Sequence, residues 1–462
     1  MLRVAVIGSG PSGVYTAQSL IEQQTVPDIE VYVLDRLPCP YGLVRYGVAP
    51  DHEKIKSLQN NLRTVLEHPR VRFLGNVEVG APGLGVEELR EIFDAVVFCV
   101  GAATDRHLGI PGEELPGSHP ATEFVAWYSA HPDAAAVRFT LAARSALVIG
   151  VGNVAVDVAR MLSRGAAELA ATDMPQGPLG ALADSRVEDV WMVGRRGPSQ
   201  AKFTTKELRE LGSLPDTDLC VRPEELALDP AYRDPGELPA VGRRNVEVLR
   251  GWAERATERA ASGPEAGAAG PRRRIHLRFF LRPVEVLGDA AGVRGVRFER
   301  TAPDGHGGVT GTGEFEDIEG QLVLRSVGYR GTPQPGLPFD ERTGTVPHRA
   351  GRVLRDGAPL PGVYVAGWIK RGPTGVIGTN RPCAKETAQS LLADAPALAE
   401  RGAGEDPVVA LTRAGQCPVP WPGWLAIEAA EAEWGRGLGR GTVKLPDWAG
   451  LLAAAGAADP TR

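Results

Sequence analysis

The chain opens with an apolar segment, a glycine-rich turn and a segment of helical periodicity. Leu2–Ile7 is mostly apolar, which predicts a short buried strand. Gly8, Gly10 and Gly13 follow with the spacing GxGxxG, and Pro11–Gln23 has the pattern of a helix with proline in its first turn. A strand, this spacing and a helix together indicate a dinucleotide-binding fold. The glycines alone would also fit a structural turn.

The next apolar segments favour the dinucleotide interpretation. Glu30–Leu34 predicts a second strand, which ends at Asp35, an acid that can accept hydrogen bonds from ribose hydroxyls. Phe93–Val100 predicts the strand that closes this first domain, although an ordinary core strand would have the same pattern.

The same order of elements returns in the middle of the chain. Ala146–Ile149 predicts a strand, and residues 150–155 (GVGNVA) have the GxGxxA variant of the turn before another apolar helix. Val190–Val193 predicts the next strand, which is followed by Arg195 and Arg196 where the first fold has an acid. Two guanidinium groups suit the 2′-phosphate of NADP. A solvated surface pair is the alternative.

Two nucleotide folds in one chain indicate an electron relay between a bound flavin and a nicotinamide. Residues 164–187 are an insertion in the second fold, and Gln321–Val327 predicts its closing strand. The fold class is therefore α/β, with two Rossmann-like dinucleotide-binding domains.

Composition and charge exclude several other classes of protein. The 462 residues predict two to three domains, and a net charge of −6 gives no support for nucleic-acid or membrane-surface binding. The five cysteines include no CxxC pair, which excludes a dithiol centre, a cysteine-ligated zinc site and a cysteine-held iron–sulfur cluster, and we expect no metal site. The sequence has neither a signal-peptide pattern nor a long apolar run, so we expect a cytoplasmic protein without a membrane span.

Three stretches carry a family resemblance: residues 41–52 (YGLVRYGVAPDH), 193–210 (VGRRGPSQAKFTTKELRE) and 362–380 (GVYVAGWIKRGPTGVIGTN). They resemble adrenodoxin reductase and the bacterial NADPH–ferredoxin reductases. The resemblance covers residues 2–395, and Trp424–Gly456 is similar to the longer tail of the adrenodoxin-reductase branch. It implies that an NADP domain (107–330) is inserted into an FAD domain (1–106 and 331–462, including the C-terminal tail).

The resemblance also implies the residues of each site. For FAD these are, besides Gly8, Gly10 and Gly13, the residues Ser12, Asp35, Leu43 and Val79, with Trp368, Gly375, Val376 and Ile377 at the isoalloxazine ring. For NADP they are Arg106, Gly150, Val151, Gly152, Asn153, Val154, Arg195, Arg196 and Glu207, with Gly375 near both cofactors.

Local features of the sequence support the FAD-binding residues that the resemblance implies. We expect a helix from Thr374 to Leu392, whose N-terminus would stabilise a reduced flavin. Trp368 follows a strand and is expected to flank a ring system, with core packing as the alternative. His52 and Glu210 match the pair that the family places beside nicotinamide and flavin. We expect them to orient the nicotinamide, because hydride transfer needs no proton shuttle. A surface histidine before a helix over Glu53–Glu67 is the alternative for His52.

A basic cluster suggests a partner site. Arg243 and Arg244 precede a predicted helix over Asn245–Ala261, and in the family an acidic iron–sulfur protein docks in this region. A solvated helix face is the alternative. Residues 260–271 are rich in Ala, Gly and Pro and predict a mobile loop or linker.

Together these features predict an FAD-dependent NADPH–ferredoxin reductase. Hydride passes from NADPH to FAD, and single electrons then pass to a ferredoxin-type protein that serves, for example, a cytochrome P450 system. The alternatives are an NADPH-dependent flavin diaphorase or monooxygenase, and a non-enzymatic flavin- and NADP-binding redox sensor.

Overall fold

Two units make up the fold of this chain in a computed structural model, which describes residues 1–80, 84–139, 141–262, 273–398 and 404–457. Unit 1 comprises Met1–Thr104, Ser129–Ala135 and Gly328–Arg462, and unit 2 comprises Asp105–Tyr128 and Ala136–Val327. Most of the loop predicted at 260–271 lies outside the described residues. Within those residues, no helix is both long and apolar enough to cross a membrane.

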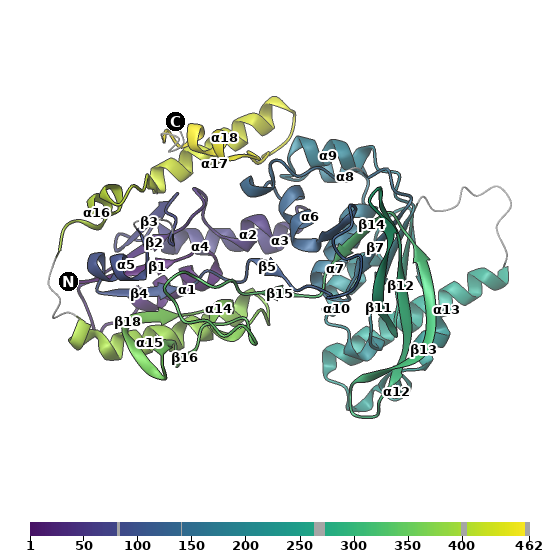
Figure 1. Cartoon of the computed structure of the whole chain (residues 1–462). Coiled ribbons are helices and arrows are strands. Elements are labelled where there is room, and N and C mark those ends of the chain that lie inside the picture. Colours follow the sequence, from purple (N-terminus) through teal and green to yellow (C-terminus); the bar gives the residue numbers. More distant parts are fainter. Residues whose placement is uncertain (81–83, 140, 263–272, 399–403, 458–462) are drawn as a thin grey trace. The chain divides into compact units, whose positions relative to one another are not determined.

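An eight-stranded sheet forms the centre of unit 1, in the order β16-β17-β18-β4-β1-β2-β3-β19 (Figure 1). Its strands are β1 (Leu2–Ile7), β2 (Ile29–Leu34), β3 (Val71–Gly75), β4 (Ala95–Phe98), β16 (His348–Arg349), β17 (Arg352–Arg355), β18 (Ala358–Val365) and β19 (Val419–Pro420). The five strands from β18 to β3 run parallel, and the outer strands pair antiparallel. A separate two-stranded sheet pairs β5 (Thr104–Asp105) with β15 (Tyr329–Arg330).

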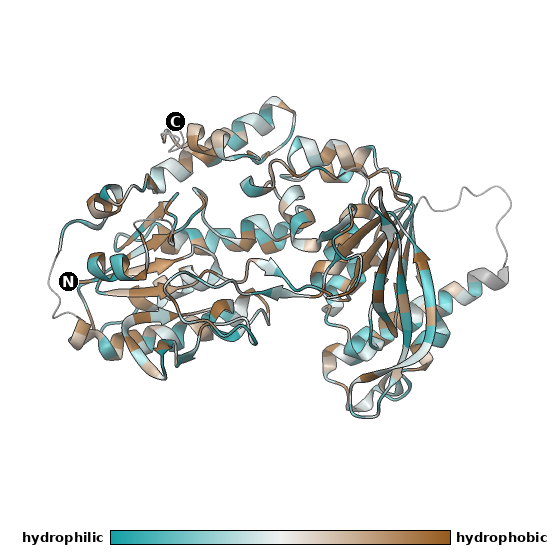
Figure 2. Ribbon diagram, in the orientation of Figure 1, coloured by the Kyte–Doolittle hydropathy of each residue, from teal (hydrophilic) through white to brown (hydrophobic). Residues whose placement is uncertain are grey.

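Helices cover both faces of this sheet, because the strands are apolar on both sides. In β1, Val4 and Val6 belong to the core under α1 and α15, whereas Ala5 and Ile7 belong to the core on the other face. Figure 2 shows these strands as apolar ribbons. The helices of unit 1 are α1 (Pro11–Ile21), α2 (Leu43–Tyr46), α3 (Glu53–Lys56), α4 (Leu58–Leu66), α5 (Val86–Ile92), α14 (Trp368–Arg371), α15 (Asn380–Leu398), α16 (Pro407–Arg413), α17 (Trp421–Gly437), α18 (Trp448–Ala454) and the 3₁₀ turns η1 (Pro132–Ala134) and η4 (Ile377–Thr379).

Two helix predictions in unit 1 were wrong in their bounds. The helix expected from Thr374 begins only at Asn380, because Gly375, the second residue of the predicted helix, has φ of 82° and cannot continue a right-handed helix. The helix expected over 53–67 is divided into α3 and α4, which meet at Ser57.

Unit 2 contains a parallel six-stranded sheet in the order β6-β14-β7-β8-β10-β9. These strands are β6 (Ser118–Pro120), β7 (Ser145–Ile149), β8 (Asp189–Val193), β9 (Thr217–Val221), β10 (Arg273–Arg278) and β14 (Leu322–Arg325). An antiparallel sheet of β11 (Leu281–Asp289), β12 (Gly292–Pro303) and β13 (Val309–Glu319) packs through Val296 and Phe298 on Leu147 and Ile149 of β7.

Helices complete unit 2 (Figure 1). They are α6 (Ala121–Tyr128), α7 (Asn153–Ser163), α8 (Ala166–Ala170), α9 (Gln176–Ala183), α10 (Thr205–Leu211), α11 (Pro223–Ala227), α12 (Pro230–Arg233), α13 (Ala240–Ser262) and the 3₁₀ turns η2 (Pro198–Gln200) and η3 (Pro235–Glu237). The predicted insertion is therefore the helices α8 and α9. Both units have the predicted order of strand, glycine turn, helix and strand, and the predicted fold class is confirmed.

Candidate functional site

The first glycine turn lies between β1 and α1 and has no room for a side chain at its first and third glycines. Gly8 has φ of 105°, and a Cβ added to it would lie 2.7 Å from the carbonyl oxygen of Cys99. A Cβ on Gly13 would overlap the carbonyl oxygen of Gly8. The glycines therefore let α1 pack directly against the end of β1.

Asp35 follows β2 and holds this turn in place. One carboxylate oxygen accepts hydrogen bonds from the backbone N–H of Ser9 at 2.7 Å and from its hydroxyl at 2.5 Å, and the other oxygen accepts from the N–H of Leu37 at 2.9 Å. Burial raises the pKa of Asp35, and these hydrogen bonds oppose that shift. Because a carboxylate offers about four acceptor sites, one remains for a ribose hydroxyl.

The backbone of Gly42 closely approaches the N-terminus of α1. Gly10 is the N-cap, and Gly42 has φ of 50° and would bring a Cβ to 3.0 Å from the Cα of Gly10. A Cβ on Gly367 would overlap the buried hydroxyl of Ser12, and the side chain of Leu43 is 41% exposed. Such a bare helix N-terminus can receive a pyrophosphate.

The residues predicted at the isoalloxazine ring follow β18. Trp368 begins α14, and within the described residues its buried indole Nε1 has no acceptor. Val376 is 61% exposed between Gly375 and the half-buried Ile377. A buried donor without a partner beside an accessible backbone fits a planar ligand with acceptor atoms, which a flavin is. Val79, by contrast, lies half-buried against a core cluster of the sheet.

The second glycine turn, in unit 2, has a similar backbone. Gly150 has φ of 139°, and a Cβ there would overlap the carbonyl oxygen of Ser326. Gly152 is the N-cap of α7, and a Cβ on it would meet nothing within 4 Å. Asn153 begins α7 and its Oδ1 accepts from the N–H of Thr204 at 2.8 Å, while Val154 lies in the first turn. The carbonyl of Val151 accepts from the N–H of Lys202 at 2.8 Å. These bonds attach the turn to the segment that leads into α10.

Arg195 and Arg196 follow β8, the strand that corresponds to β2. Their carbonyls accept hydrogen bonds from the Thr301 hydroxyl and the Phe280 N–H, so their backbone is fixed. Arg195 is exposed and Arg196 is half-buried, and neither guanidinium has a hydrogen-bond or ion-pair partner in the described chain. Two unpaired guanidiniums at this point can bind a phosphate dianion.

The other predicted residues lie on several elements. Glu207 is buried in α10 and donates its N–H to the hydroxyl of the N-cap Thr204 at 3.4 Å. Glu210, one turn later, lies 3.6 Å from Lys206 and 3.7 Å from Arg160. His52 is buried at the N-cap of α3 in unit 1, and Arg106 is exposed in unit 2. The pairing of His52 with Glu210 stays a prediction.

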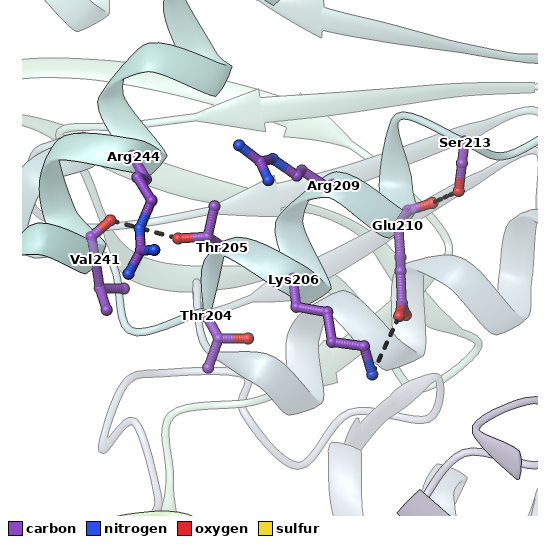
Figure 3. Close-up of a pocket in the computed structure, with 8 residues that line it drawn as sticks. All are labelled: Thr204, Thr205, Lys206, Arg209, Glu210, Ser213, Val241 and Arg244. Carbon is purple, nitrogen blue, oxygen red and sulfur yellow. Dashed lines mark hydrogen bonds and ion pairs between the residues drawn. The ribbon is translucent and has the colours of Figure 1, made fainter. Parts of the chain in front are cut away.

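A hollow of about 620 Å³ lies between α10 and the start of α13 (Figure 3). Its lining residues are Thr204, Thr205, Lys206, Arg209, Glu210, Ser213, Val241 and Arg244. Arg209 has no acid partner among the described residues, and Arg244 donates only to the carbonyl of Ala240, at 3.2 Å. Arg243, also exposed, donates to the carbonyl of Gly236 at 3.3 Å. Arg209 was not among the residues predicted from the sequence, because nothing in the sequence indicates that α10 and the start of α13 line one hollow.

All five cysteines lie in described residues and are free thiols. Burial raises the pKa of Cys39 to about 11 and that of Cys99 to about 12, so both are poor nucleophiles.

Several known proteins are similar to this chain. Residues 2–192 match the family model "Pyridine nucleotide-disulphide oxidoreductase". NADPH-ferredoxin reductase FprA of Mycobacterium tuberculosis is 45% identical over 97% of this chain and 98% of its own length. The mitochondrial NADPH:adrenodoxin oxidoreductase of Arabidopsis thaliana is 38% identical over 98% of this chain and 95% of its own. The chain belongs to the NADPH–ferredoxin and adrenodoxin reductase family.

The fold agrees over its whole length with a solved member of this reductase family. The structure of M. tuberculosis FprA in complex with NADPH matches with a TM-score of 0.89 and 42% identity, covering 98% of this chain and 99% of that chain. The predicted family resemblance is confirmed, and the chain is an oxidoreductase.

Proposed function

We propose that the protein is an FAD-dependent NADPH–ferredoxin reductase. Its cofactors are FAD and NADP(H), of which FAD accepts two electrons as a hydride and releases them singly. The observation that carries the proposal is the presence of two complete dinucleotide folds, one ending in Asp35 and the other in the unpaired Arg195 and Arg196. The predicted boundaries of the FAD domain (1–106 and 331–462) and of the NADP domain (107–330) are part of this proposal.

The residues of unit 1 would bind FAD in three places. The N-terminus of α1, with Gly8, Gly10, Ser12 and Gly13, would bind the pyrophosphate. The remaining acceptor site of Asp35 would bind the ribose. Trp368 and residues 375–377 would flank the ring system, with Leu43 and Val79 as further contacts.

The residues of unit 2 would bind NADPH. The N-terminus of α7 (residues 150–154) would hold its pyrophosphate, and Arg195 and Arg196 its 2′-phosphate. Arg106 and Glu207 would complete this site, Gly375 would lie near both cofactors, and His52 and Glu210 would orient the nicotinamide without transferring a proton.

The electron acceptor we propose is an acidic ferredoxin-type iron–sulfur protein that docks on Arg243 and Arg244. Both side chains are exposed and have no acid partner within the described chain, so their charge is available to steer an acidic surface. A cytochrome P450 system downstream and a cytoplasmic location are further parts of the proposal.

Anaerobic stopped-flow mixing of the FAD-loaded protein with NADPH tests the function. We expect rapid loss of the yellow flavin colour, followed by reduction of an added ferredoxin faster than that of a small uncharged quinone. Failure to reduce any ferredoxin while a quinone or oxygen is reduced efficiently would favour the diaphorase or monooxygenase alternative. Absence of bleaching would favour a redox sensor.

A further inference from the structure

A short turn of unit 1 lies directly against the N-terminus of α1. The N–H of Tyr41 donates to the carbonyl of Ser9 at 3.1 Å, and the backbone of Gly42 faces that of Gly10 closely enough that a Cβ would lie 3.0 Å away. The N–H of Arg45 then donates to the carbonyl of Gly42 at 3.0 Å and closes the turn. The position of this turn therefore fixes one wall of the proposed FAD site.

The C-terminal segment of the chain makes a buried contact with the same turn. Arg45 pairs with Glu431 of α17 at 2.5 Å, and their side chains are 5% and 1% exposed. The guanidinium of Arg45 also lies 5.0 Å from the ring centre of Trp424, and the rings of Trp424 and Tyr41 form a T-shaped pair with their centres 5.9 Å apart. Lys444 donates from its ammonium to the carbonyl of Arg45 at 2.6 Å. Three residues of the tail thus hold Arg45 from different sides.

Packing alone does not account for a charged pair at this point. Burying two charges is unfavourable, and apolar residues of similar volume often give equal or greater stability. A buried pair does, however, fix the direction of Arg45, because the planar guanidinium holds its N–H groups in a rigid fork that faces the carboxylate in a defined orientation. Glu431 is fixed in turn, because the same oxygen accepts from the N–H of Leu445 at 2.9 Å.

We propose that Arg45 and Glu431 are positioning residues for FAD. The segment Val419–Ala454, which we name the C-terminal clasp, holds the Tyr41–Leu43 turn against the N-terminus of α1 and thereby sets how tightly FAD is retained. This inference rests on the FAD site proposed above.

Two neighbouring acids of α17 allow a matched test. Glu431→Gln removes the charge that faces Arg45. Glu428 lies on the same helix and pairs with Arg63 at a more exposed site, so Glu428→Gln makes the same change there. Quenching of flavin fluorescence measures FAD binding to the apoprotein. We expect FAD affinity to fall about tenfold or more in Glu431→Gln and to stay near the wild-type value in Glu428→Gln. Equal FAD affinity in all three proteins would overturn the proposal.

A second variant separates positioning from stability, because Glu431→Gln leaves a buried unpaired charge that can unfold the protein. In Arg45→Met/Glu431→Leu both charges are replaced by apolar groups, which should restore the melting temperature of the apoprotein. The clasp predicts that FAD affinity stays about tenfold low in this variant. Wild-type FAD affinity at wild-type melting temperature would mean that the pair is only structural.

A control identifies which part of the account fails. Gly10→Val puts a side chain into the proposed pyrophosphate site and should abolish FAD binding. If Gly10→Val loses FAD and both Glu431 variants retain it, the clasp is wrong and the FAD site stands. If Gly10→Val binds FAD normally, the proposed FAD site itself is wrong.

Discussion

The two glycine turns share a backbone plan and differ in the groups that follow it. In unit 1, the acid Asp35 accepts three hydrogen bonds, two from Ser9 of the turn and one from the N–H of Leu37. In unit 2, Arg195 and Arg196 occupy the corresponding place and their side chains have no partner in the described chain. The first arrangement repels a 2′-phosphate and the second attracts one. The residues that follow one strand thus make the same fold suited to two different nucleotides.

The turns also differ in how closely the helix approaches the strand. Gly13 of the first turn has no room for a Cβ, because it would overlap the carbonyl oxygen of Gly8. The second turn has Ala155 at the matching position, and this methyl group is fully buried. A single methyl group therefore distinguishes the packing of α1 from that of α7.

Replacing both arginines should have the largest effect on the difference between the two turns. Hydrogen bonds to charged groups contribute roughly 1.5–3 kcal/mol each, so Arg195→Ala/Arg196→Ala should weaken NADPH binding by about 2–4 kcal/mol, or about 30- to 1000-fold. Because NADH has no 2′-phosphate, its kcat/KM should change by no more than a few-fold. Steady-state kinetics with both nucleotides would check this.

Glu207→Gln serves as the control for the arginine variant. Glu207 is proposed to contact the part that NADPH and NADH share, so its loss should affect both nucleotides alike. If the double arginine variant also loses NADH and NADPH activity in proportion, the arginines are structural.

Gly13→Ala gives the first turn the methyl group that Ala155 provides in the second, and so tests whether α1 packs more closely on its strand than α7 does. Gly13→Ala forces α1 away from β1, and overpacking of this kind destabilises by about 1–3 kcal/mol. We expect a lower melting temperature and loss of bound FAD, while NADP⁺ binding persists. Unchanged stability and FAD content would show that α1 moves freely.

The charges of Arg243 and Arg244 can be reversed without changing either glycine turn. Arg243→Glu/Arg244→Glu should slow ferredoxin reduction by about tenfold or more at low salt, and less at high salt, because a Debye length of about 10 Å at 0.1 M screens steering. Arg255→Glu, an exposed site on the same helix, is the matched control. An equal loss with a small uncharged acceptor would contradict docking.

Removing the matching methyl group from the second turn, in Ala155→Gly, should have the smallest effect. Ala155→Gly in α7 removes one buried methyl and adds backbone freedom, at about 1 kcal/mol. Thermal unfolding should show a modest decrease with both cofactors still bound. A loss as large as that of Gly13→Ala would remove the distinction between the turns.

The sequence predicted both nucleotide folds because their strands, turns and helices are local patterns. It did not predict features that depend on contacts between distant segments or on unusual backbone angles. The helix expected at Thr374 begins instead at Asn380, because Gly375 has a positive φ, and the spacing of apolar residues does not show φ. Arg209 and Arg244 line one hollow from two helices, and Arg45 meets Glu431 across 386 residues of sequence. Such contacts are set by tertiary packing and leave no periodic signal.

Binding of adenosine 2′,5′-bisphosphate and of adenosine 5′-monophosphate to the wild-type protein tests the central claim most directly. Calorimetry needs neither turnover nor a partner, and the two ligands differ only in the group that Arg195 and Arg196 are proposed to bind. We predict that the bisphosphate binds about 30- to 1000-fold tighter, and that Arg195→Ala/Arg196→Ala abolishes this difference. Equal affinity of the wild-type protein for both ligands would contradict the account.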